Sequence, residues 1–227
     1  SLRRAEPGLA GVVLNVNTRD TNVILGDRYA VLWGQAWLEE ELCQLTFRLS
    51  VPSFFQINRA QTEVLYSVAL DFAGLTGAET VLDLYCGIGT ISLALARRAG
   101  RVIGAEIVPQ AIEDAKENAK RNGIDNAEFF CGDAGAVAQK LTEEGIRPQV
   151  ICVDPPRKGL SPHVPAILAG MAPERIVYVS CDPATLARDI NRLSDLGYHP
   201  VKVQGVDLFP RTAHVETVAL LEQKNTL

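Results

Sequence analysis

The sequence predicts an α/β fold, in which helices cover both faces of a mostly parallel sheet that ends in an antiparallel hairpin. Short β-prone runs alternate with helical patterns between residues 80 and 196, which is typical of a parallel sheet. Two further β-prone runs follow with no helix between them, and they predict the C-terminal hairpin. Hydrophobic residues make up 47% of the 227 residues and charged residues 22%, which excludes a disordered chain.

A small β element is expected ahead of this sheet, in residues 1–58. Runs rich in β-branched and aromatic residues, separated by Asn, Asp and Gly, predict strands at 12–16, 21–25 and 29–33. A helical pattern of apolar residues then covers 61–75. We therefore expect two domains, divided between residues 58 and 59.

The α/β domain, residues 59–227, is expected to contain a regular succession of elements. Apolar β-prone runs predict strands at 81–85, 102–105, 128–131, 150–153 and 176–179. Helical patterns lie at 91–99, 109–122 and 183–196. The closing hairpin is predicted at 201–207 and 215–221.

Composition limits the functions that this chain can have. Lys and Arg number 22 and Asp and Glu 27, and the resulting net charge of −5 argues against nucleic-acid binding by charge alone. No apolar run approaches the roughly 20 residues of a membrane span, and no secretion signal is present, so we expect a cytoplasmic protein without a membrane partner. The chain starts at Ser1 and its only methionine is Met171, which indicates a fragment or a processed chain.

The cysteines and histidines do not predict a metal site. The chain has five cysteines, an odd number, and no CxxC pair, which argues against a disulfide framework, a zinc site or an iron–sulfur cluster. The three histidines show no metal-ligand spacing. We therefore expect no metal.

A glycine-rich turn follows the first strand of the α/β domain, in Asp83-Leu-Tyr-Cys-Gly-Ile-Gly-Thr90. Glycines such as Gly87 let the backbone approach a ligand, and the helix N-terminus behind them attracts polar groups. The dinucleotide fingerprint needs a third glycine, and Ser92 stands in its place. This departure weakens a nicotinamide interpretation. A tight turn without a ligand is the simpler alternative.

Acidic residues at three successive strand ends favour a cofactor site over a simple turn. Open α/β sheets bind ligands beyond the carboxyl ends of their strands. Asp83, Glu106 and Asp133 occupy these positions and suit S-adenosylmethionine. Glu106 is expected to bind the ribose hydroxyls, Asp83 to face the methionine part and Asp133 to reach the adenine.

Two further strand ends carry residues with reactive or orienting groups. Asp154 precedes two prolines, whose stiff backbone suits a carboxylate that orients a planar base. Cys181 follows the next strand, where Asp182 is expected to cap a helix that has Pro183 in its first turn. A helix N-terminus favours a thiolate, so Cys181 is a candidate nucleophile, although buried structural cysteines are more common.

The final hairpin contributes a candidate base. Glu216 begins its second apolar run, and apolar surroundings would raise the carboxyl pKa and suit it to proton abstraction. An ordinary exposed strand residue is the alternative. His214 is a rival base, to which we assign a substrate contact or a structural role. Cys86 is expected to be a small packing residue.

Taken together, these segments closely resemble the RNA uracil-5-methyltransferases. The resemblance covers residues 50 to 225 and is carried by Phe54-Phe-Gln-Ile-Asn58, Asp83-Leu-Tyr-Cys-Gly-Ile-Gly89, Asp154-Pro-Pro-Arg-Lys-Gly159, Val179-Ser-Cys-Asp-Pro-Ala-Thr-Leu-Ala-Arg-Asp189 and Asp207-Leu-Phe-Pro-Arg-Thr-Ala-His-Val-Glu216. Within the family, the Ala-Thr-Leu-Ala-Arg-Asp run looks more like the ribosomal RNA enzymes than the transfer RNA ones. The resemblance thus implies a class I, Rossmann-like methyltransferase domain and 5-methyluridine formation in RNA, with 23S ribosomal RNA as the favoured substrate.

The resemblance also implies roles for individual residues. Cys181 would be the nucleophile and Glu216 the base, and Gln56, Tyr85, Glu106 and Asp154 would line the cofactor and uracil sites. Candidate phosphate or substrate contacts are Arg59, Arg157, Lys158, Arg188, Arg211 and His214. Arg188 is also the cation expected to favour the Cys181 thiolate. Residues 1–58 would be the remnant of a central or RNA-binding domain, so RNA affinity is expected to be weak.

Three other functions stay open at this point. Asp-Pro-Pro also occurs in methyltransferases that act on exocyclic amines, but an aromatic residue follows there and Arg157 follows here. A non-catalytic module that binds RNA or the cofactor would retain the glycine-rich turn without chemistry. A nicotinamide-dependent dehydrogenase is the third alternative, since the glycine-rich turn after the first strand could also bind a dinucleotide.

Overall fold

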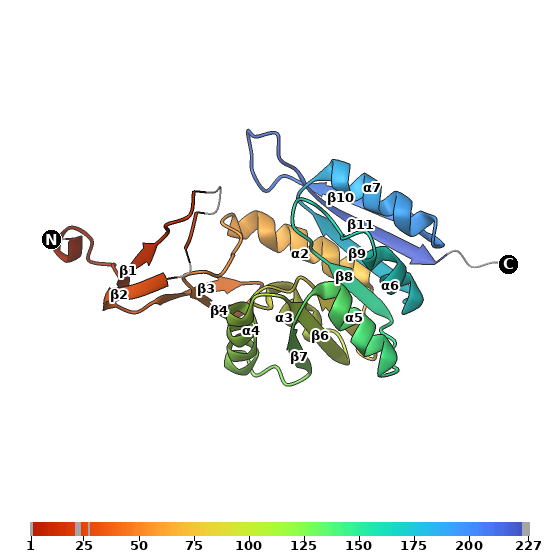
Figure 1. Ribbon diagram of the computed structural model, residues 1–227, viewed down its shortest axis with the longest axis horizontal. Helices are drawn as coiled ribbons and strands as arrows, with labels where there is room; N and C mark the ends of the chain where they lie inside the picture. Colours follow the sequence, from red (N-terminus) through yellow and green to blue (C-terminus); the bar gives the residue numbers. More distant parts are fainter. Residues whose placement is uncertain (1, 21–23, 27, 224–227) are drawn as a thin grey trace.

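The computed structural model describes residues 2–20, 24–26 and 28–223, and within them a seven-stranded sheet forms the centre of the molecule (Figure 1). Its strand order is β10-β11-β9-β8-β5-β6-β7. The strands are β5 (Thr80–Leu84), β6 (Arg101–Glu106), β7 (Ala127–Cys131), β8 (Val150–Val153), β9 (Arg175–Ser180), β10 (Tyr198–Val206) and β11 (Glu216–Gln223). Strands β5 to β9 pair in parallel, whereas β11 pairs antiparallel with both β9 and β10. The predicted α/β fold with its antiparallel hairpin is confirmed.

Helices cover both faces of this sheet (Figure 1). One buried cluster joins the sheet to α2 (Arg59–Ala73), α3 (Thr90–Ala96) and α4 (Pro109–Arg121). A second buried cluster on the other face joins it to α5 (Ala134–Glu143), α6 (Val164–Gly170) and α7 (Pro183–Ser194). The sequence did not predict α5 and α6. Their buried positions are occupied mainly by small or β-branched residues, which give a weak helical signal.

A first hairpin stands away from the sheet at the N-terminal end of the molecule (red in Figure 1). After the short helix α1 (Leu2–Ala5), β1 (Gly11–Val16) pairs antiparallel with β2 (Arg28–Gly34), which confirms two of the predicted strands. The predicted strand at 21–25 is wrong for its last two residues, because Ile24 and Leu25 have no strand structure. Its other residues lie outside the described part of the chain.

A second hairpin, which the sequence did not predict, packs directly on the sheet domain. Strands β3 (Trp37–Leu42) and β4 (Leu45–Ser50) form it, and Leu42, Leu45 and Phe47 are buried in the same cluster as α2, α3 and α4. The side-chain oxygen of Asn118, in α4, accepts a hydrogen bond from the Arg48 backbone amide at 2.7 Å. The division between residues 58 and 59 remains a prediction.

None of the helices in the described part of the chain combines the length and the apolar character that a membrane crossing requires.

Candidate active site

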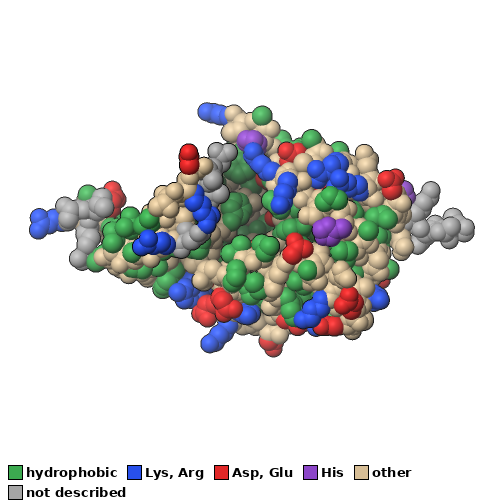
Figure 2. All heavy atoms as spheres, in the orientation of Figure 1, with side chains coloured by type: hydrophobic (Ala, Val, Ile, Leu, Met, Phe, Trp, Pro, Cys, Tyr) green, Lys and Arg blue, Asp and Glu red, His purple; other side chains and the backbone are tan. Residues whose placement is uncertain are grey.

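A pocket opens at the carboxyl ends of β5 and β8, in the crevice where α/β sheets bind ligands. Its walls come from the segment before α2, from α2 and α3, and from the loops after β5 and β8. The residues that line it are Phe54, Phe55, Gln56, Tyr66, Asp83, Tyr85, Cys86, Gly87, Ile88, Thr90, Ile91 and Asp154. Figure 2 shows a hollow on the face that bears the N-terminal hairpin, with hydrophobic side chains inside it and basic side chains beside it.

The glycine-rich turn shapes one wall of the pocket. Tyr85 has a φ of 67° and Gly87 a φ of 54°, so the chain turns sharply through left-handed conformations between β5 and α3. A Cβ at Gly87 would meet no atom within 4 Å, which leaves room for a ligand close to the backbone. The left-handed Tyr85 could not be predicted from the sequence, because bulky residues rarely adopt this conformation.

Asp83 lies at the bottom of the pocket and is fully buried. Its Oδ2 accepts a hydrogen bond from the Ser92 hydroxyl at 2.5 Å, whereas its Oδ1 has no hydrogen-bond partner. Burial raises the pKa of this carboxyl to about 7. This unsatisfied oxygen at the pocket is free to accept a hydrogen bond from a bound ligand. Ser92 replaces the third glycine of the dinucleotide fingerprint, and in this fold its hydroxyl is the hydrogen-bond donor to Asp83.

Asp154 faces the same pocket from the loop after β8. Burial, together with the nearby carboxyl groups of Glu216 and Asp83, raises the pKa of its carboxyl to about 8. Asp83, Asp154 and Glu216 thus form a cluster of acids with raised pKa values. Such a cluster favours a ligand that carries positive charge.

Glu106 and Asp133 lie at the ends of the next two strands, as predicted, and both bind backbone amides. Glu106 accepts hydrogen bonds from the backbone amides of Gly87 at 3.3 Å and Val108 at 2.9 Å. Asp133 is the N-cap of α5 and accepts from Gly135 and Ala136. Their contacts with ribose and adenine remain predictions.

Cys181 directly follows β9 and is partly buried. Asp182 caps α7 and Pro183 lies in its first turn, as the sequence predicted. The expectation of a thiolate favoured by the helix is wrong for this state, because the carboxylate of Asp182 takes up the free amides of the helix N-terminus. Burial, together with Glu216 and Asp154, raises the pKa of the thiol, and Arg157 opposes that rise.

The sheet register brings Glu216 beside Cys181. In the antiparallel β9–β11 pair Thr217 lies opposite Ser180, so the residue before Thr217 and the residue after Ser180 are neighbours. The side chain of Glu216 is 4% exposed, and burial raises the pKa of its carboxyl, as the sequence analysis expected. A base with a raised pKa therefore lies next to the candidate nucleophile.

Of the expected phosphate contacts, Arg157 lies near Cys181, whereas Arg188 is engaged in contacts away from it. Nη2 of Arg157 lies 3.1 Å from Nδ1 of His214, which links the loop after β8 to the loop between β10 and β11. Arg188 instead pairs with Asp189 and donates to the Lys158 carbonyl. The expectation that Arg188 stabilises the thiolate is therefore wrong, since Arg157 is the cation that acts on Cys181.

The other basic candidates are exposed. Lys158 and Arg211 have exposed side chains, and Arg211 has a φ of 70° in the loop before β11. Arg59 pairs with Glu41 and Glu63. Their contacts with RNA remain predictions.

Asp189 is a functional support that sequence reasoning missed. Its side chain is fully buried in α7 and accepts hydrogen bonds from the backbone amide of Leu160 at 2.8 Å and from the hydroxyl of Tyr178 at 2.9 Å. It thereby fixes the loop that begins with Asp154 against β9 and α7. The helical pattern of α7 gave no signal for this role, because an acid among apolar residues usually points to solvent.

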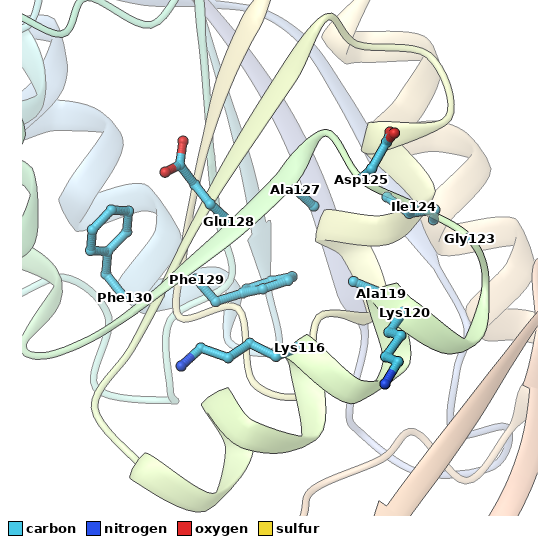
Figure 3. A pocket seen from close by; sticks show the side chains of 10 residues that line it. All are labelled: Lys116, Ala119, Lys120, Gly123, Ile124, Asp125, Ala127, Glu128, Phe129 and Phe130. Atoms are coloured by element: carbon cyan, nitrogen blue, oxygen red, sulfur yellow. The ribbon is translucent and has the colours of Figure 1, made fainter.

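A larger groove lies elsewhere, at the free edge of β7 (Figure 3). It measures about 640 Å³ and is bordered by Lys116 and Lys120 from α4 and by Phe129. It contains none of the predicted site residues. Within the described ranges of the chain, no group of three or more His, Cys, Asp or Glu side chains is placed to hold a metal ion.

The family model described as tRNA (Uracil-5-)-methyltransferase matches residues 31–224. The chain belongs to this family. Among named relatives, an uncharacterized RNA methyltransferase from Clostridium acetobutylicum is 53% identical over 216 residues, which is 95% of this chain and 47% of the relative. Another from Halalkalibacterium halodurans is 52% identical over 224 residues, or 99% of this chain and 49% of the relative. The chain thus spans about half the length of these relatives.

A solved structure resembles the fold and the sequence. It is the Pyrococcus abyssi tRNA (uracil-54, C5)-methyltransferase in complex with S-adenosyl-L-homocysteine, with a TM-score of 0.76 and 34% identity over 93% of this chain and 50% of that chain. A Streptococcus mutans structure described as a SAM-dependent methyltransferase has a TM-score of 0.67 at 12% identity, over 97% of this chain and 63% of that chain, and shows likeness of fold alone. The chain thus has the α/β fold of S-adenosylmethionine-dependent methyltransferases.

Proposed function

We propose that this domain methylates C5 of a uridine in RNA with S-adenosylmethionine as the methyl donor. One observation carries the proposal: the β9–β11 register puts a cysteine and a buried carboxyl side by side, at the edge of a pocket lined by two further acids. Family membership and the S-adenosyl-L-homocysteine complex of the Pyrococcus abyssi relative support the same cofactor.

The residues of the pocket fit this cofactor. The unsatisfied Oδ1 of Asp83 would accept a hydrogen bond from the methionine ammonium, and the open space at Gly87 would admit the nucleoside. Glu106, Asp133, Tyr85 and Gln56 complete the proposed set. When bound, the cofactor supplies an electrophilic methyl group on a sulfonium. The buried acids favour that positive charge.

The chemistry of uracil explains why a thiol and a carboxylate are needed. C5 is a poor nucleophile until the Cys181 thiolate adds to C6, which breaks the C5–C6 double bond and creates an enolate with electron density at C5. C5 then takes the methyl group. Glu216 removes the remaining C5 proton, the double bond reforms, and Cys181 leaves as a thiolate. Asp154 would orient the base by hydrogen bonding, after the base has been taken out of its stack.

We further propose ribosomal RNA, and specifically 23S ribosomal RNA, as the substrate. The Ala184-Thr-Leu-Ala-Arg-Asp189 run supports this choice, because it resembles the ribosomal RNA enzymes of the family. The Pyrococcus abyssi relative, by its name, acts on tRNA, which makes tRNA the alternative. Methylation of deproteinised 23S ribosomal RNA but not of a tRNA pool would support the ribosomal substrate, and the reverse would overturn it.

Release of tritium from C5 tests the reaction itself. With RNA that carries tritium at C5 of uridine, the wild-type protein should release one tritium for each methyl group transferred. The Glu216→Gln variant should transfer the methyl group but retain the tritium and accumulate a covalent complex, because no base removes the proton. Methyl transfer without tritium release by the wild-type protein would instead indicate an exocyclic amine as the target.

A further inference from the structure

A short segment, residues 51–57, crosses the pocket between β4 and α2, and we call it the strap. Phe54, Phe55 and Gln56 from the strap line the pocket. The strap has no helix or strand structure, and the side chains of Phe54 and Ile57 are 78% and 86% exposed. In the middle of the strap, Phe55 packs against Phe47 of the core, with ring centroids 6.3 Å apart. The exposed residues on either side of Phe55 depend for their position on the side-chain contacts at the two ends of the strap.

The first end is fastened to α4 through Asp114. This side chain is 6% exposed, and its Oδ2 accepts hydrogen bonds from the hydroxyls of Ser50 at 2.5 Å and Ser53 at 2.7 Å. Its Oδ1 accepts from the Gln110 amide at 3.1 Å. Hydrogen bonds to a charged, buried acceptor are among the stronger ones in proteins. The same helix follows the loop of Glu106, on the cofactor side of the site.

The second end is fastened through Asn58, which performs two tasks with one side chain. Its Oδ1 accepts a hydrogen bond from the Gln61 amide and caps α2. Its Nδ2 donates to the Leu208 carbonyl at 3.0 Å, in the loop that leads to Glu216. The strap thus reaches from the helix behind Glu106 to the loop before the proposed base.

We propose that Asp114 and Asn58 are positioning residues, which hold the strap across the pocket so that Phe54 and Gln56 meet the bound cofactor and base. The inference rests on the proposed function for the identity of these ligands. Without the anchors the strap must be ordered each time a ligand binds, which lowers affinity and slows the reaction.

The Asp114 anchor is tested by protease accessibility and cofactor affinity. In Asp114→Ala, chymotrypsin should cut faster after Phe54 and Phe55, and the calorimetric Kd for S-adenosyl-L-homocysteine should rise about tenfold, as for a binding-competent strap populated about one tenth of the time. Asp114→Asn, which retains an acceptor, should restore part of the affinity. The matched control is Glu113→Gln, which removes an exposed charge from the same helix and should behave as the wild type.

Ser53→Ala provides the second variant if Asp114→Ala does not fold, because it removes only the strap's own hydroxyl. It should change cleavage and Kd in the same direction. A folded Ser53→Ala or Asp114→Ala protein with the cleavage rate and Kd of the wild type would overturn the assignment of Asp114.

The Asn58 anchor is tested by separating its two tasks. Aspartate caps helices as well as asparagine but cannot donate to the Leu208 carbonyl. Asn58→Asp should therefore keep the melting temperature, and it should lower kcat for methyl transfer about tenfold while KM for the RNA changes little. An unchanged kcat would overturn the role of Asn58.

Failure of the proposed function gives a different pattern. If the wild-type protein transfers no methyl group to RNA but the Asp114 series changes Kd and cleavage as expected, the uridine reaction is wrong and the Asp114 anchor stands. If the wild-type protein methylates uridine and all strap variants match it, the reaction stands and the anchors are wrong.

Discussion

Burial of carboxyl groups sets the chemistry of individual residues in the pocket. Burial raises the pKa of Asp83 to about 7, and burial together with the carboxyl groups of Glu216 and Asp83 raises the pKa of Asp154 to about 8. Asp83 also has an oxygen without a partner. The raised pKa values of both acids and the unpaired oxygen of Asp83 suit them to a cationic ligand more than to a structural role.

The raised pKa values predict that cofactor affinity depends on pH. At low pH both carboxyls are protonated and neutral, and they ionise as the pH rises through about 7 and about 8. Affinity for S-adenosylmethionine, whose sulfonium is positive, should therefore rise about tenfold between about pH 6 and about pH 9. S-adenosyl-L-homocysteine has no sulfonium and should show a smaller change. Calorimetry at several pH values measures both, and equal slopes for the two ligands would contradict this role of the acids.

Arg157 is the residue on which ionisation of Cys181 depends. It lowers the pKa of a thiol that burial and two carboxyl groups raise. Arg157→Ala should shift the pH profile of Cys181 alkylation by iodoacetamide to higher pH. Mass spectrometry of the peptide that contains Cys181 measures this alkylation. Arg98→Ala, which breaks an exposed ion pair with Asp71, is the matched control and should leave the profile unchanged. An unshifted profile in Arg157→Ala would show that another cation acts on the thiol.

Sequence reasoning identified residues at strand ends better than residues that support them. Asp83, Asp154 and Cys181 follow from the rule that ligands bind at the carboxyl ends of parallel strands. The hydrogen bonds of Ser92, Asp114 and Asp189 join residues that are separated in the sequence and meet only in the fold, so no local sequence pattern predicts them. The prediction that Arg188 acts on Cys181 was wrong for the same reason, because the ion pair between Arg188 and Asp189 cannot be read from the sequence.

At the scale of elements, the β3–β4 hairpin belongs energetically to the sheet domain. Phe47 has no exposed surface and contacts the cluster that joins α2, α3 and α4 to the sheet. In β1 and β2, by contrast, apolar side chains such as Leu32 remain exposed, with 62% of its surface accessible. The adjacent glutamates Glu39 to Glu41 obscured β3 in the sequence, because they interrupt the alternation of apolar and polar residues that marks a half-buried strand.

Because Phe47 is buried and Leu32 is exposed, replacing each with alanine should change the free energy of unfolding by different amounts. Phe47→Ala should lower the free energy of unfolding by about 3 to 5 kcal/mol, because it leaves a cavity in the core. Leu32→Ala should change it by less than about 0.5 kcal/mol. Denaturant unfolding measures both values. A small effect of Phe47→Ala would mean that the second hairpin folds apart from the sheet domain, as the division after residue 58 implies.

Part of the negative charge of the whole molecule belongs to its site. The net charge of −5 includes Asp83, Asp154 and Glu216, which lie in or beside the pocket. Basic side chains gather near the hollow in Figure 2. The surface beside the hollow is therefore more positive than the net charge of the molecule indicates, which favours contact with an RNA strand there. The chain also spans about half the length of its relatives, and contacts with RNA are proposals for the whole protein.

The central claim is that Cys181 bonds to C6 of a uridine while its C5 is methylated. RNA that contains 5-fluorouridine tests this claim most directly, because fluorine at C5 cannot be removed as a proton and the adduct is trapped. With S-adenosylmethionine present, denaturing mass spectrometry of the wild-type protein should find a covalent RNA complex that carries the added methyl group, and Cys181→Ala should form none. A complex that persists in Cys181→Ala, or methylation of ordinary RNA by that variant, would contradict the account.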